Sequence, residues 1–127
     1  MFINRTVQDA INEQIKHELY AAYLNLAMST HFEAENFSGF ASWTNMQAKE
    51  EVENPMKLFG FVNERGGKVV LQAIDQPPSE FGSLLEVFEE ILKHEQKVTS
   101  LIYMLYEIAQ KENYYATQVM MHRFIEE

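Results

Sequence analysis

Three glutamates in this sequence have the residue type and placement to do chemistry. Glu18, Glu51 and Glu95 lie far apart along the chain, and each interrupts a pattern of apolar side chains. A carboxylate that faces a protein core costs on the order of several kcal/mol unless a partner compensates its charge. Hard cations such as Fe²⁺, Mn²⁺, Mg²⁺ and Ca²⁺ accept carboxylate oxygens as ligands. A shared metal site is therefore the interpretation we favour.

Other interpretations stay open at this point. An interior acid can be protonated, can reach solvent or can pair with a basic residue, and three acids can share protons in a buried cluster. Metal binding is favoured because the three acids come from three different predicted helices. In addition, no Lys or Arg lies on the apolar stripes that we predict for those helices.

The elements that must position these acids are predicted to be helices. The clearest pattern is an apolar stripe at alternating steps of four and three residues, which places one face of a helix toward a core. Its members are Leu84, Phe88, Ile91, Glu95, Val98, Ile102, Leu105 and Ala109. Glu95 is the only charged member, so we expect it to face the interior.

Two helices precede this one. The first is predicted to run to about Phe32 and to carry Glu18 on its inward face, and the second runs to about Arg65 and carries Glu51. Asn4 or Thr6 can cap the start of the first helix, and Asn36 or Ser38 can start the second. The pair Gly66-Gly67 is expected to end the second helix.

The remaining chain completes a bundle. Residues 66–83 are too many for a simple turn, so we expect this segment to cross the molecule. A third helix follows Ser83, and a fourth begins near Tyr114 and reaches Glu127 without a cap or breaker, so we expect it to be incomplete. The predicted fold is all-α: one domain over residues 1–127, a four-helix bundle with one long crossover between helices 2 and 3, and no fifth helix.

Composition narrows the function classes. The net charge of −9 argues against nucleic acid as a partner and is compatible with attraction of cations. The absence of cysteine excludes thiolate metal sites and cysteine nucleophiles. No apolar run approaches the ~18 residues of a membrane span, and the first residues lack the plan of a signal peptide. We therefore expect a cytoplasmic protein with no membrane partner.

The acids fit a known bundle plan. Di-iron carboxylate bundles take one Glu from each of two helices and a Glu-x-x-His motif from each of the other two. Glu18 and Glu95 match the single acids, and Glu51 begins a motif of the right spacing with Asn54 at the histidine position. The partner motif would start near Glu127 and run past the end of this sequence.

The whole chain resembles the prokaryotic non-haem ferritins, which belong to the ferritin-like di-iron carboxylate family. The stretches that carry the resemblance are residues 12–14, 18–20, 47–51, 64–69, 77–79, 94–95 and 115–117. The resemblance implies iron storage in a homo-oligomeric shell of 24 subunits, with the C-terminal part of the family's domain absent here. It also implies that O₂ or peroxide oxidises Fe²⁺ at a di-iron ferroxidase centre within each subunit and that ferric mineral collects inside the shell.

Site residues follow from the resemblance by position. It implies that Glu18, Glu51 and Asn54 hold one iron, and that Glu51 bridges to a second iron held also by Glu95, so that the three glutamates are the catalytic residues. Glu50 and Glu127 match acids that prokaryotic members use around a third iron. Alternatively, they are two acids on a solvent-exposed face.

Four residues depart from the family pattern, and one of them, Arg123, replaces a tryptophan usual on the fourth helix. Asn54 replaces the imidazole ligand, Asn25 replaces a tyrosine usual near the centre, and Pro55 breaks the helical hydrogen bonding beside Glu51. A kink or bulge is expected at the site. The departures raise the alternative of an iron-binding shell subunit with an impaired or absent ferroxidase centre. A third hypothesis is a four-helix protein that does not store iron, either a different carboxylate-metal oxidase, which would stay a small oligomer, or a plain scaffold.

Overall fold

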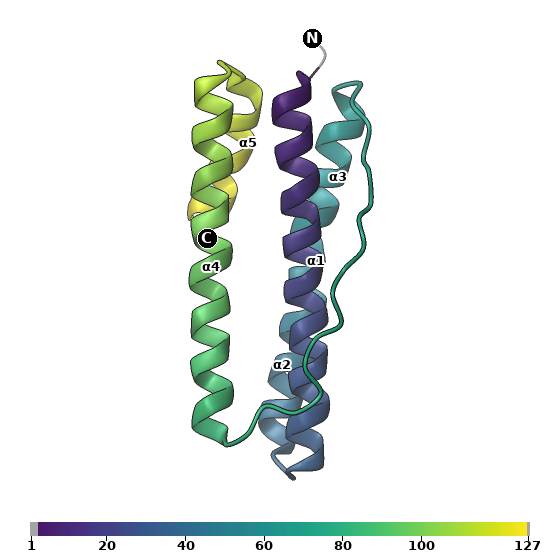
Figure 1. The fold of residues 1–127 in the computed structure, drawn as a ribbon, viewed down its shortest axis with the longest axis vertical. Helices are drawn as coiled ribbons and strands as arrows, with labels where there is room; N and C mark the ends of the chain where they lie inside the picture. Colours follow the sequence, from purple (N-terminus) through teal and green to yellow (C-terminus); the bar gives the residue numbers. More distant parts are fainter. Residues whose placement is uncertain (1–2, 127) are drawn as a thin grey trace.

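The chain folds into a bundle of long helices that lie side by side. The structure is a computed structural model that describes residues 3–126, apart from the side chains of Arg123 and Glu126. Its helices are α1 (Arg5–Ala34), α2 (Ser38–Glu51), α3 (Glu53–Glu64), α4 (Leu84–Lys111) and α5 (Tyr115–Glu126). Figure 1 shows α2 and α3 following one another along α1, and α5 returning beside the C-terminal half of α4. None of the helices in this described part is long and apolar enough to cross a membrane.

The described residues form five helices, so the prediction of a fold with no fifth helix is wrong. The additional element arises because the predicted second helix is divided at Val52, where α2 ends and α3 begins. Pro55 provides the physical reason, since it has no N–H to donate to the carbonyl of Glu51. Regular bonding resumes with the amide of Met56, which donates to the carbonyl of Val52 over 3.3 Å. The last predicted helix, beginning near Tyr114, corresponds to α5.

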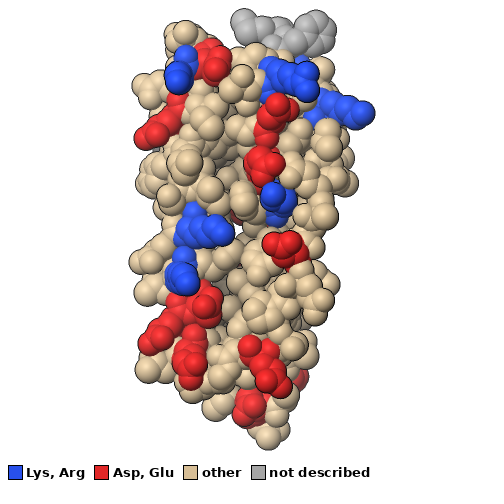
Figure 2. Space-filling view, viewed as in Figure 1, with Lys and Arg blue, Asp and Glu red and all other residues tan. Residues whose placement is uncertain are grey.

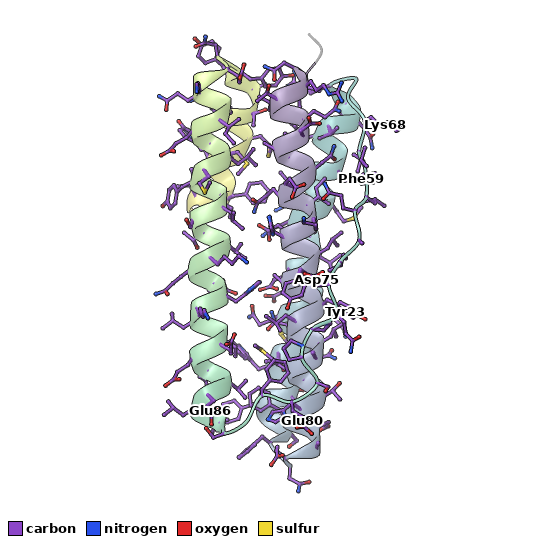
Figure 3. All side chains as sticks on the ribbon, viewed as in Figure 1. Tyr23, Phe59, Lys68, Asp75, Glu80 and Glu86 are labelled. Carbon is purple, nitrogen blue, oxygen red and sulfur yellow. The ribbon has the colours of Figure 1, made fainter. Side chains whose placement is uncertain are left out.

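The crossover between α3 and α4 lies against α1. Beyond α3 the chain turns at Gly66, whose φ of 71° suits glycine, and then runs extended to Ser83. The side-chain amide of Asn12 donates to the carbonyl of Lys68 over 3.1 Å and accepts from the amide of Val70 over 3.2 Å. Figure 3 labels Lys68 and Asp75 on this segment, which follows the outside of the bundle from one end to the other. The prediction that residues 66–83 cross the molecule is therefore confirmed.

The interior contains two apolar clusters at different heights along α1. One cluster includes Val7, Ile11 and Ile15, and it receives Leu58 from α3 and Met121 from α5. The other lies toward the opposite end and includes Leu24, Met28, Phe32, Ala41 and Val87. Glu18 lies on α1 between these clusters and is only 2% exposed. A polar layer thus separates two apolar layers, and the candidate site lies in that layer.

Candidate metal centre

One cavity brings the predicted site residues together. It has a volume of about 600 Å³, and its lining includes five of the six predicted ligands: Glu18 from α1, Glu50 and Glu51 from α2, Asn54 from α3, and Glu95 from α4. The sixth, Glu127, lies outside the described residues. The predicted ligands in this lining are separated by as many as 77 positions along the chain, from Glu18 to Glu95.

Glu18 is the most deeply buried acid of the group. It lies in the middle of the 30-residue helix α1, one turn after Gln14. The side-chain Nε2 of Gln14 donates to Oε1 of Glu18 over 3.0 Å, and Gln14 is itself 3% exposed. A carboxylate at this depth requires hydrogen-bond donors, and a glutamine four residues earlier on the same face can provide one. Gln14 was not among the predicted site residues, although its i, i+4 spacing from Glu18 indicates this pair.

Glu51 is the last residue of α2 and faces α1. Its Oε2 accepts a hydrogen bond of 2.9 Å from the side-chain amide of Asn25. Burial, and then the neighbouring carboxylates of Glu95 and Glu18, raise the pKa of Glu51 to about 8, while the Asn25 hydrogen bond acts in the opposite direction. Without a cation, the protonated form of this carboxyl group is therefore favoured at neutral pH. A bound cation would reverse that preference by compensating the charge.

Glu95 does not face a core, contrary to the expectation from the apolar stripe. The C-terminal members of the stripe, Ile102, Leu105 and Ala109, are buried, whereas Glu95 is exposed to solvent. The difference arises because α5 packs against only the C-terminal half of α4 (Figure 1). Glu95 lines the cavity from its open side, and Glu50 is likewise exposed. Because these two side chains are exposed, they can bind an ion without giving up packing contacts in the core.

Asn54 lines the cavity from the first turn of α3, just beyond the break at Val52. The expected distortion at the site is present, and it lies two residues before Asn54. Pro55 next to it is buried, so its ring packs inward. Among the described residues that line the cavity there is no histidine. The candidate ligands are therefore carboxylate and amide oxygens, a set suited to hard cations.

The structure adds cavity residues that the stripes did not predict. Glu53 and Lys57 both line the cavity from α3, one helical turn apart. Lys57 is exposed and does not belong to an apolar stripe, so it reaches the cavity from its solvent side. Its signal in the sequence is its spacing of three residues from Asn54, which places both on one helical face.

The side chains are not gathered around a point as they would be around a bound ion. In the part of the chain that the structure describes, no group of three or more His, Cys, Asp or Glu side chains is placed so that it could hold a metal. Glu51 and Glu95 nevertheless lie close enough for a side-chain hydrogen bond, which is one cause of the raised pKa of Glu51. The carboxylate and amide oxygens of these residues are ligand types that fit iron.

The histidines that precede two of the acids lie elsewhere. His17 and His94 do not line the cavity, which agrees with their displacement around the helix from Glu18 and Glu95. Burial lowers the pKa of both histidines. The ring of His94 lies 5.7 Å from the ring of Tyr20. These imidazoles belong to the contact between α1 and α4 rather than to the cavity.

Comparison with known proteins gives a consistent result. The family description "Ferritin-like domain" matches residues 8–127. A bacterial non-heme ferritin of Staphylococcus saprophyticus is 39% identical over 98% of this chain and 75% of its own length, and one of Staphylococcus aureus is 35% identical over the same shares. Among solved structures, an open pore ferritin from the archaeon Archaeoglobus fulgidus has a TM-score of 0.95 and 40% identity, over 98% of this chain and 76% of that one.

Proposed function

Because the chain belongs to the ferritin family, we propose that it stores iron and oxidises Fe²⁺ at the cavity between α1, α2, α3 and α4. The resemblance to prokaryotic non-haem ferritins is confirmed, and that family supports iron storage. The observation that carries the oxidase proposal is the gathering of Glu18, Glu51 and Glu95 from three helices on one cavity. These are the residues we propose as iron ligands and as the catalytic set.

We assign the proposed ligands to separate iron positions. Glu18, Glu51 and Asn54 would hold one iron as substrate, and Glu51 with Glu95 would hold a second. Glu50 and Glu127 would serve a further position nearby. This assignment is supported by the cavity lining for every residue except Glu127. It is also supported by the raised pKa of Glu51, which results first from burial and then from the neighbouring carboxylates, both of which a cation would compensate.

The proposed reaction is balanced without an oxidisable side chain. Each Fe²⁺ gives up one electron, and two electrons with two protons convert O₂ to hydrogen peroxide, which can itself accept further electrons from Fe²⁺. The chain binds and orients the ions and changes its own proton content. Metal binding displaces the proton that the raised pKa keeps on Glu51.

A second candidate function is supported by Asn54. An amide oxygen is a weaker iron ligand than imidazole, and no histidine lines the cavity within the described residues. The chain would then be an iron-binding shell subunit with slow or absent ferroxidase activity. Iron storage is common to both candidates, and they differ in the rate at which the protein itself oxidises Fe²⁺.

The assembly that we propose is a homo-oligomeric shell of 24 subunits in the cytoplasm. Family membership supports it, and the charge of the chain is compatible with it. Figure 2 shows acidic side chains gathered where α4 begins, and a hollow there is lined by Glu80, Glu86, Glu89 and Glu90. Light scattering tests the assembly: a large shell supports storage, and a monomer or dimer of the natural protein would reject it.

The oxidase proposal is tested by following ferric absorbance after Fe²⁺ is added in air. We expect oxidation faster than in buffer alone and a large loss of rate in Glu51→Gln. Glu107→Gln is the matched control, because Glu107 is an exposed glutamate of α4 that does not line the cavity. A wild-type rate equal to that of buffer would reject the oxidase and leave the binding subunit as the remaining candidate.

A further inference from the structure

Asn25 connects the candidate site to the backbone of α1. Its Nδ2 donates to the carbonyl of Ala21 over 3.0 Å and to Oε2 of Glu51 over 2.9 Å, and the residue is 7% exposed. The carbonyl of Ala21 can only accept a hydrogen bond. The atom that makes both contacts must therefore be the amide nitrogen, and both of its hydrogens are used.

Glu51 needs such a connection because of its place in the chain. It is the last residue of α2, directly before the break at Val52, and Pro55 has no N–H for its carbonyl. The helix alone therefore restrains Glu51 less than a residue in mid-helix. By contrast, α1 is an uninterrupted helix of 30 residues that continues on both sides of Asn25. A buried hydrogen bond from α1 thus links the end of α2 to the more regular helix.

We propose that Asn25 is a positioning residue for metal binding: its amide holds one oxygen of Glu51 in place and leaves the other oxygen to ligate a cation in the cavity. The inference rests on the proposed iron site, whose acids line that cavity. An amide donor also suits this position chemically. It stabilises the ionised form of Glu51 that a metal requires, and it adds no charge to a site already rich in carboxylates.

Under this proposal, the hydrogen bond from Asn25 increases the affinity of the site for a metal ion. A hydrogen bond to a carboxylate that orders a ligand before binding removes part of the cost of ordering it during binding. Removal of the donor should therefore weaken metal binding by about tenfold, in the range expected for a hydrogen bond to a charged group. The spectrum of the bound metal should change as well, because Glu51 can then ligate through either or both oxygens.

The test uses Co²⁺ titrated into the full chain without Fe²⁺, with affinity and visible absorption bands as readouts. Asn25→Leu removes the donor at similar volume. Ser29→Ala is the matched control, since Ser29 lies one turn further along α1, is 9% exposed and donates to the carbonyl of Ala41 on α2 over 2.8 Å. It removes a buried link between the same two helices without touching the cavity. Asn25→Ala serves if the leucine variant does not fold.

We expect weaker Co²⁺ binding and altered bands in the Asn25 variant, with wild-type behaviour in Ser29→Ala. Equal binding and equal bands in the wild type and the Asn25 variant would overturn the role of Asn25 while leaving the site intact, provided that Glu51→Gln abolishes binding. An equal loss in Ser29→Ala would also overturn it, because the effect would then be general to the contact between α1 and α2. Wild-type protein that binds no Co²⁺ through Glu51 would overturn the proposed site and this inference together.

Discussion

Gln14 and Glu18 form a buried pair on α1, in which the glutamine amide donates to the carboxylate over 3.0 Å. Glu18 lies between the two apolar clusters of the bundle, and Gln14 lies one turn earlier, at the height of Ile11 and Ile15 in the first cluster. The pair keeps a carboxylate in the interior through a hydrogen bond from a neighbouring turn. A carboxyl group held in this way can offer oxygen ligands to a cation that enters the cavity.

Gln14→Leu should destabilise the metal-free protein by about 1–3 kcal/mol, because it removes a donor to a buried carboxylate while keeping a similar volume. Chemical denaturation measures the change. The double variant Gln14→Leu with Glu18→Gln is the control, since a neutral partner needs the donor less. If the cost of Gln14→Leu is the same in both backgrounds, the hydrogen bond is not its cause.

Stability of the metal-free protein should fall as pH rises from about 4.5 to about 8. The pKa of Glu51 is about 8 in the folded chain against an ordinary value of 4.5. The folded state therefore keeps a proton that the unfolded state has lost, so this contribution is present below pH 4.5 and disappears as pH rises through 8. Thermal unfolding in a chelator should show the decline, and Glu51→Gln should flatten it. An unchanged slope in that variant would argue against the raised pKa.

Asn54→His should increase the rate of Fe²⁺ oxidation several-fold, because imidazole is a better ligand for iron than an amide oxygen. Asn63→His is the matched control, since Asn63 is an exposed residue of the same helix α3 and does not line the cavity. Ferric absorbance in air gives the rates. No gain in Asn54→His, or an equal gain in Asn63→His, would count against the assignment of Asn54 to the site.

Asn12→Ala should loosen the crossover and leave the bundle folded. Both hydrogen bonds from its side chain reach the crossover, one to the carbonyl of Lys68 and one from the amide of Val70. We expect a loss of about 1–2 kcal/mol and faster hydrogen exchange at the Val70 amide. Exchange at Val70 that matches the wild type would show that other contacts hold the crossover.

The main elements of this fold follow from local sequence signals. Ser83 starts α4 through a capping box with Glu86. Gly66 adopts a positive φ in the turn directly after α3. These signals involve residues close in sequence, where the chemistry of a cap or turn is sufficient. The apolar stripes likewise pointed to Glu18, Glu51 and Glu95, which line one cavity, because helical periodicity relates residue number to the face of a helix.

Other features depend on which elements pack together, and sequence periodicity does not specify that. The stripe placed Glu95 on the inner face of α4, but its exposure depends on how far α5 covers that face. Pro55 indicated a distortion, yet the division at Val52 and the resulting five helices were not predicted. The contact between Asn25 and Glu51 joins two helices, and its existence depends on their relative register.

Diffraction from crystals soaked anaerobically in Fe²⁺, with anomalous signal measured at the iron edge, tests the central claim most directly. We predict anomalous peaks within ligand distance of Glu18, Glu51 and Glu95, with the Glu95 side chain moved toward them. Iron bound only elsewhere on the protein, with these three carboxylates still apart, would contradict the account.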